Sequence, residues 1–130
     1  MDWKRITPAK VILLTGCATV LGADASLNEP LETVHGTASY YADALAGNRT
    51  ASGIPYDPSA LVAAHRSYPF GTRLRVENLA NGRVVEVRVV DRGPFVRGRV
   101  IDLSRAAAER LDFIREGLTR VRIDVLEWGA

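Results

Sequence analysis

The sequence lacks several features that define common protein classes. Its 130 residues contain one cysteine and two histidines, which excludes a disulfide framework and a multi-cysteine zinc site. No run of about 18 apolar residues occurs, which excludes a polytopic membrane protein. With 47% hydrophobic and 25% charged residues, the chain has enough apolar surface to form a core and is not intrinsically disordered. Its length fits one domain.

The chain also has little net charge beyond its first residues, and it has no lysine after Lys10. Taking Lys4, Arg5, Lys10 and Asp2 from the 17 basic and 15 acidic residues leaves fourteen of each. A formally neutral domain lacks the positive potential that attracts nucleic acids. The two histidines have no metal-ligand spacing. We therefore expect no nucleic-acid partner, no metal and no cofactor.

The first 16 residues have the arrangement of segments that is typical of a secretory signal peptide. A basic stretch precedes the apolar run 11–14, as in signal peptides. Residues 14–17 read Leu-Thr-Gly-Cys and resemble the bacterial lipobox, in which the cysteine receives lipid. We therefore predict a signal peptide over 1–16 and lipidation of Cys17, followed by a flexible tether to residue 33. The alternative is an idle or buried thiol in a frayed N-terminus.

The residue after the cysteine predicts a location. Ala18 stands there, with no aspartate, and this resembles the outer-membrane sorting pattern of Gram-negative lipoproteins. We expect a chain anchored by lipid to the membrane, on the periplasmic side of the envelope and at the outer membrane. The sequence shows no sign of oligomerisation, and we expect a monomer.

The remainder of the chain is predicted to be rich in β-structure. Alternation of apolar and polar residues predicts strands, Asn81-Gly82 predicts a hairpin, and 42–57 is a long loop of the kind that is often functional. Ser104 is a good N-cap for one helix over 104–111. The predicted strands are 34–41, 61–65, 73–78, 83–90, 100–103 and 120–126.

Seven short motifs then occur in a fixed order. They are Gly36-Thr-Ala-Ser-Tyr-Tyr41, Thr50-Ala-Ser-Gly53, Ala63-Ala-His65, Pro69-Phe-Gly-Thr72, Asn81-Gly82, Asp91-Arg-Gly-Pro-Phe95 and Asp102-Leu-Ser104. Together they resemble the rare lipoprotein A (RlpA)-like family over 34–126. The resemblance implies a mainly β fold, a small six-stranded double-psi β-barrel with one short helix, over 34–127. Many members carry a C-terminal peptidoglycan-binding domain; because the sequence ends at Ala130, we expect none here.

The resemblance also implies an activity. Known members are endolytic lytic transglycosylases that cleave MurNAc–GlcNAc strands of peptidoglycan, prefer strands without stem peptides, and leave 1,6-anhydro-MurNAc ends. In this reaction the 6-hydroxyl of the sugar attacks C1, so no water has to be activated. One carboxyl that gives and then takes a proton can therefore suffice. Ordinary glycosidases, in contrast, use a pair of carboxylates.

Asp91 is the candidate for that carboxyl. It lies where a strand breaks into a Gly-Pro turn, and a carboxyl shielded by Phe95 and the barrel wall would have a raised pKa, as a general acid requires. From the residues alone, the favoured interpretation is that Asp91 caps the turn or pairs with Arg92, because structural carboxylates outnumber catalytic ones. The family resemblance favours catalysis, because the aspartate of this motif is essential there.

Other residues are candidates for supporting roles. His65 follows an apolar strand and could orient the sugar or the acid, or be a satisfied core histidine. Asp102 is expected to organise backbone or arginine neighbours. The rings of Tyr40, Tyr41 and Phe95 could stack on sugars at such a site, although aromatics in a barrel are more often core. The predicted substrate-binding residues are Tyr40, Thr50, Ser52, Arg92 and Phe95, and those with a structural role near the site are Gly53, Gly71, Thr72, Gly93 and Asp102.

One position departs from the family pattern. Family members usually have Glu after Thr-Ala-x-Gly, where this sequence has Ile54. An isoleucine cannot transfer a proton or bind a sugar hydroxyl. The alternative hypothesis is therefore a non-catalytic, expansin-like lipoprotein that binds glycan or a partner in cell division or the cell wall.

Overall fold

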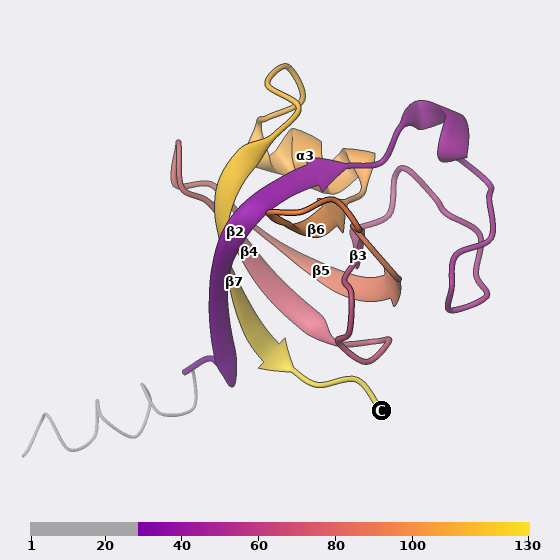
Figure 1. Cartoon of the computed structure of the whole chain (residues 1–130), viewed down its shortest axis with the longest axis horizontal. Coiled ribbons are helices and arrows are strands. Elements are labelled where there is room, and N and C mark those ends of the chain that lie inside the picture. Colours follow the sequence, from indigo (N-terminus) through magenta and orange to yellow (C-terminus); the bar gives the residue numbers. More distant parts are fainter. Residues whose placement is uncertain (1–28) are drawn as a thin grey trace, which may run out of the picture.

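The computed structural model describes residues 29–130. The predicted signal peptide, Cys17 and most of the predicted tether therefore lie outside the described residues. Within this range the chain forms six strands, one α-helix and one short 3-10 helix, as Figure 1 shows. They are β2 (Glu32–Tyr40), η1 (Asp43–Leu45), β3 (Val62–Ala64), β4 (Arg73–Asn78), β5 (Val84–Asp91), β6 (Arg99–Leu103), α3 (Arg105–Leu111) and β7 (Thr119–Glu127).

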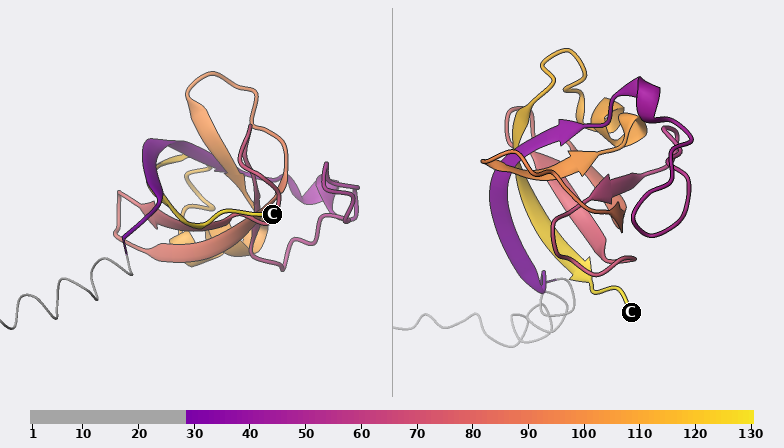
Figure 2. Two further views of the ribbon diagram at one scale, coloured as in Figure 1. Left: turned by 90° about the horizontal axis from the view of Figure 1, so that it is seen from below. Right: turned by 45° about the vertical axis from the view of Figure 1, so that its right-hand side comes forward.

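The six strands close into a barrel in the order β2-β6-β3-β5-β4-β7, which can be followed in Figures 1 and 2. The pairs β2/β6 and β3/β5 are parallel, and the other four pairs are antiparallel. Closure leaves no exposed sheet edge in the barrel. The predicted mainly β, six-stranded barrel with one short helix is confirmed.

The barrel is filled by the apolar positions that alternate along each strand. In β5, Val85, Val87 and Val89 are buried, whereas Glu86 and Arg88 between them point outward. Residues of a strand alternate between its two faces, so this spacing places every second side chain in the core. Each fully buried Val or Leu contributes roughly 1.5–3 kcal/mol by leaving water.

The barrel begins earlier than the sequence predicted. Glu32 pairs with Val125 and Thr33 with Asp124, so both residues belong to β2 and not to a tether that ends at residue 33. Their polar side chains carry no apolar alternation, and the pairing with β7 is made by backbone groups far away in sequence. Sequence periodicity does not detect such pairing.

The connections are anchored to the barrel. The Ser104 hydroxyl accepts a hydrogen bond from the Ala107 N–H (3.3 Å) and caps α3 as predicted, and Ala107, Ala108 and Leu111 are buried against the barrel. The long connection between β2 and β3 extends from one side of the barrel (Figures 1 and 2). Among the described residues, no helix is both long and apolar enough to cross a bilayer.

Candidate active site

Asp91 is the last residue of β5, where that strand meets an irregularity in its pairing with β3. Its half-buried carboxyl accepts three hydrogen bonds. Oδ1 receives the backbone N–H groups of Ala51 (2.8 Å) and Arg92 (2.9 Å), and Oδ2 receives the hydroxyl of Tyr41. Donors on both oxygens fix the orientation of the carboxyl and stabilise its negative charge.

The side chain of Arg92 does not pair with Asp91. Its guanidinium donates to the carbonyls of Tyr68 (2.8 Å) and His65 (3.3 Å) and lies 4.0 Å from the centre of the Phe70 ring. The ion pair considered from the sequence is therefore absent from the described contacts of both residues. Arg92 stabilises the turn after β3, and its guanidinium is already engaged there.

The loop that carries the predicted residues Thr50, Ser52 and Gly53 lies on the end of β5. The Ser52 N–H donates to the Val90 carbonyl (3.1 Å), and the buried Thr50 hydroxyl donates to the Ile54 carbonyl (2.7 Å). Gly53 has a φ of +100°, which glycine adopts without strain. This closed turn delivers the Ala51 N–H to Asp91.

Ile54 contributes to this turn through its backbone. Its carbonyl accepts both the N–H and the hydroxyl of Thr50, whereas its side chain is 50% exposed. The turn therefore forms without a carboxylate at position 54.

Phe95 does not shield the carboxyl of Asp91, contrary to the sequence-based expectation. Its side chain is 80% exposed, because the Arg66 guanidinium holds the carbonyls of the loop, those of Pro94 (2.6 Å) and Val96 (3.0 Å) among them, and leaves the ring outside. The shielding around Asp91 comes from Tyr41 and the loop at Ala51.

Gly93 separates Phe95 from a second carboxyl. A Cβ atom on Gly93 would lie 3.7 Å from the Phe95 ring and 3.8 Å from Asp102 Oδ2. Gly93 has a φ of +129°, a conformation that favours glycine. Asp102, on β6, accepts the hydroxyl of Ser39. No arginine pairs with Asp102 within residues 29–130, so the expected arginine neighbour is replaced by a serine.

His65 is used as a hydrogen-bond acceptor. Its Nδ1 receives the N–H groups of Ser67 (3.1 Å) and Tyr68 (3.0 Å), and its ring stacks on the Tyr68 ring with 3.6 Å between centres. Burial, followed by the nearby charge of Arg92, lowers the pKa of His65 to about 4. The imidazole is therefore neutral near pH 7, with its proton on Nε2. Its backbone N–H donates to the Asp91 carbonyl (3.1 Å), which ties the two residues together.

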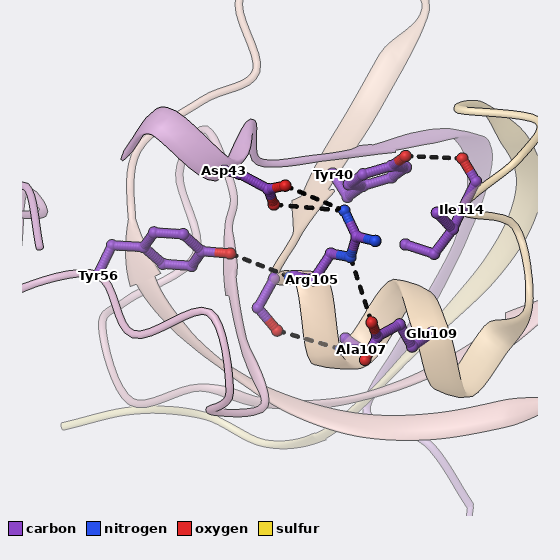
Figure 3. A network of polar contacts seen from close by, with 8 residues as sticks. Tyr40, Asp43, Tyr56, Arg105, Ala107, Glu109 and Ile114 are labelled. Atoms are coloured by element: carbon purple, nitrogen blue, oxygen red, sulfur yellow. Dashed lines mark hydrogen bonds and ion pairs between the residues drawn. The ribbon is translucent and has the colours of Figure 1, made fainter. Parts of the chain in front are cut away.

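The structure places Tyr41, and not Tyr40, next to Asp91. The Tyr40 hydroxyl donates to the Ile114 carbonyl (2.7 Å), as Figure 3 shows, and its ring contacts Phe113 edge-on. Tyr40 thus packs on the core, away from Asp91. The sequence offers Tyr41 as a ring that could stack on sugars, but not as a hydrogen-bond donor to Asp91. The alternation along β2, which puts Ser39 and Tyr41 on the opposite face from Tyr40, is the signal that could have indicated this role.

Gly71 and Thr72 hold a neighbouring turn in place. The Gly71 N–H donates to the Val89 carbonyl (2.8 Å) at a φ of +88°. Thr72 is fully buried, and its hydroxyl accepts the Gly129 N–H (3.0 Å). Both residues position β5 and make no contact with the Asp91 carboxyl among the described hydrogen bonds.

The described residues thus bring Asp91, Tyr41, Asp102, Ser39 and Gly93 to one side of the barrel. The chemistry available there is proton transfer and hydrogen bonding at carboxyl and hydroxyl groups. Over residues 29–130, no three His, Cys, Asp or Glu side chains are grouped so that they could hold a metal ion.

These features define a small, closed double-psi β-barrel with a hydrogen-bonded carboxyl at the end of one strand. The family model described as lytic transglycolase matches residues 33–123, and the chain belongs to this family.

Known proteins agree with this membership. The chain is 58% identical over 93 residues to the "Probable endolytic peptidoglycan transglycosylase RlpA" of Nostoc sp., a match that covers 70% of this chain and 25% of the relative. It is 48% identical over 99 residues to the endolytic peptidoglycan transglycosylase RlpA of Campylobacter jejuni, with 76% and 36% covered. The chain thus spans about a quarter to a third of these relatives.

A solved structure has the same barrel. The apo expansin of Clavibacter michiganensis superposes with a TM-score of 0.59 at 26% sequence identity, covering 76% of this chain and 52% of the expansin.

Proposed function

We propose that this chain is an endolytic peptidoglycan lytic transglycosylase with Asp91 as its acid–base residue. The observation that carries the proposal is the carboxyl of Asp91, held on both oxygens at the end of β5. Membership of the lytic transglycolase family supports it, as do the names of the relatives from Nostoc and Campylobacter.

In the proposed reaction, protonated Asp91 gives its proton to the glycosidic oxygen between MurNAc and GlcNAc. The C1–O bond breaks, the 6-hydroxyl of MurNAc attacks C1, and the Asp91 carboxylate takes the hydroxyl proton. The product is a 1,6-anhydro-MurNAc end, and Asp91 returns to its starting form. We further propose a preference for strands without stem peptides, with the exposed ring of Phe95 and the hydroxyl of Ser52 contacting the sugars.

The test is a digest of purified glycan strands, with and without stem peptides, analysed by mass spectrometry. We expect 1,6-anhydro ends, more of them from strands without peptides, and none with Asp91→Asn. Asp112→Asn makes the same change at an exposed helix end and should cleave at the parental rate. Reducing ends without the anhydro mass, or full activity of Asp91→Asn, would refute the mechanism.

A second candidate function is glycan binding without cleavage. The observation that favours it is Ile54, whose half-exposed apolar side chain stands where the family usually has a carboxylate. Binding of strands without cleavage by the parent chain would support it. Activity that appears in Ile54→Glu would then make residue 54 the cause, because the turn that presents this side chain is closed by backbone groups.

We also propose that the barrel is anchored by lipid on Cys17, on the periplasmic side of the outer membrane. The proposal rests on the lipobox-like residues 14–17 and on Ala18. Mass spectrometry of the mature protein from cells should show a chain that begins at Cys17 and carries acyl groups. Cys17→Ser should abolish the acylation, and cell fractionation should then find the variant outside the outer-membrane fraction. An unmodified Cys17 within an uncleaved chain would refute it.

A further inference from the structure

The carboxyl of Asp91 is one end of a chain of contacts that starts at helix α3. The backbone N–H of Arg105, in the first turn of α3, donates to the hydroxyl of Tyr56 (3.0 Å), as Figure 3 shows. The ring of Tyr56, only 3% exposed, stacks on the ring of Tyr41 with 4.5 Å between centres and 29° between planes. The hydroxyl of Tyr41 then donates to Asp91 Oδ2.

This arrangement restrains Tyr41 through its ring and through its hydroxyl. Stacking restricts the Tyr41 ring, and the ring that restricts it is itself held by the helix. An ion pair of the Arg105 guanidinium with Asp43 (3.3 Å) joins the connecting segment to α3, and a second pair with Glu109 (3.2 Å) lies within the helix. A hydroxyl on a rigid ring can hold a carboxyl oxygen in one orientation, which a flexible donor cannot.

We infer that Tyr41 is a positioning residue that holds Asp91 in its reactive orientation and stabilises its ionised form. This inference rests on the proposed function, in which Asp91 alternates between acid and carboxylate. Oδ1 is bound to two backbone groups that cannot be removed by side-chain substitution. Among the described hydrogen bonds of this carboxyl, the one from the Tyr41 hydroxyl is therefore the one that a side-chain substitution can remove.

The groups around Asp91 agree with this role. Burial, followed by the hydrogen bond to Asp91, raises the pKa of Tyr41, so the hydroxyl keeps its proton over the range in which a carboxyl titrates. The other titratable groups that act on Tyr41 are Asp102 on β6 and Tyr56 in the connection. His65 and Arg92 contact Asp91 through their backbone N–H groups. His65 is neutral near pH 7, and the Arg92 guanidinium is bound to carbonyls of the turn. The hydrogen bond to Asp91 Oδ2 thus comes from the Tyr41 hydroxyl.

The test compares Tyr41→Phe with a matched hydroxyl deletion, Tyr40→Phe, whose hydroxyl bonds to the Ile114 carbonyl and not to Asp91. In the full chain labelled with ¹³C at aspartate side chains, the Asp91 signal, assigned by its loss in Asp91→Asn, is followed through a pH titration. We expect the midpoint for Asp91 to rise by about one pH unit in Tyr41→Phe, because a donor to the charged form is lost. It should stay at the parental value in Tyr40→Phe.

Cleavage of glycan strands gives the second readout. In Tyr41→Phe we expect kcat to fall about tenfold with little change in KM, since orientation and not binding is lost, and the limb of the pH–rate profile set by Asp91 should move to higher pH. An unchanged midpoint in Tyr41→Phe, or an equal rise in Tyr40→Phe, would overturn the inference. The titration does not depend on enzymatic activity. An inactive parent chain would therefore count against the proposed function, while the titration would still test the role of Tyr41.

Discussion

At the scale of single residues, the imidazole of His65 makes structural contacts through its Nδ1 and its ring. Its Nδ1 accepts two backbone N–H groups of the turn that follows, which a protonated imidazole cannot do. The fold therefore favours the neutral ring, and burial lowers the pKa of His65 to about 4. A histidine in the unfolded chain titrates near 6.5.

This difference predicts a dependence of stability on pH. Between about pH 6.5 and 4 the unfolded chain binds a proton at His65 that the folded chain does not, so stability is lost as the pH falls through this window. Because the ring is partly open to solvent, we expect a loss of about 1 kcal/mol from this residue. Urea unfolding at pH 7 and at pH 4.5 measures it.

His65→Asn is the informative variant for this effect. An asparagine Oδ1 can accept the same two backbone N–H groups, and it does not titrate. The loss of stability between pH 7 and 4.5 should therefore be smaller in His65→Asn than in the parent. An equal loss in both proteins would show that other groups cause it.

The carboxyl of the candidate site is easier to propose from the sequence than its surroundings. Asp91 stands out by its place between a strand and a Gly-Pro turn together with the family resemblance, and Thr50 and Gly53 by one of the motifs that carry this resemblance. Tyr41 is expected only as a ring that could stack on sugars, whereas its hydroxyl bonds to Asp91. Phe95 is expected to cover the carboxyl, whereas its ring is exposed. Which of two adjacent tyrosines faces a site, and whether a loop ring lies outside, depends on long-range contacts such as those of Arg66 with loop carbonyls.

At the scale of secondary-structure elements, Ser104 joins β3 to the start of α3. Its fully buried hydroxyl accepts the Ala107 N–H (3.3 Å) and lies 3.4 Å from the Val62 nitrogen. Ser104→Ala would leave these donors without an acceptor, so we expect a loss of about 1–2 kcal/mol in the free energy of unfolding. Chemical denaturation followed by circular dichroism measures it.

Ser59→Ala is the matched control for Ser104→Ala. The Ser59 hydroxyl is exposed and bonds only to Asp57 among the described residues, so its loss should change stability by less than about 0.5 kcal/mol. If both variants lose the same stability, the cap is not the source of the effect.

The elements themselves were largely predictable, because their signals are local. Apolar and polar residues alternate along β4 and in the middle of β5, and α3 has an N-cap followed by strong helix formers. The first strand was placed too late, since Glu32 and Thr33 are recruited by pairing with β7. The strand order is likewise set by pairings distant in sequence, which periodicity does not detect; the family resemblance implied the type of barrel.

At the scale of the whole molecule, Asp124 links three neighbouring strands of the barrel. Its carboxyl, on β7, accepts the Thr33 hydroxyl of β2 (2.8 Å) and pairs with Arg75 of β4 (3.2 Å) and with Arg122 (3.0 Å). Burial acts to raise the pKa of Asp124, but the Thr33 hydrogen bond and then the two arginines outweigh it, so the net pKa lies below its usual value.

Removing this carboxylate should therefore weaken the closed barrel as a unit. Asp124→Asn leaves two guanidinium groups without their shared anion; because both arginines are about 41% exposed, water compensates part of the loss, and we expect a cost of about 2 kcal/mol. For a domain of this size that lowers Tm by about 10 °C. Calorimetry at pH 7 measures it, with Asp57→Asn, at an exposed aspartate bound only to Ser59 among the described residues, as the control that should hardly move.

The same carboxylate predicts where acid unfolding begins. Since the pKa of Asp124 is lower in the folded chain, its contribution is present above about pH 4 and is lost as the pH falls through the folded value. The window lies below that of His65, so the two contributions are separable. Asp124→Asn should flatten the loss of Tm below pH 4 and leave the loss between pH 6.5 and 4 unchanged. A parent chain and variant with parallel curves below pH 4 would show that β2, β4 and β7 are held by their backbone pairing and core alone.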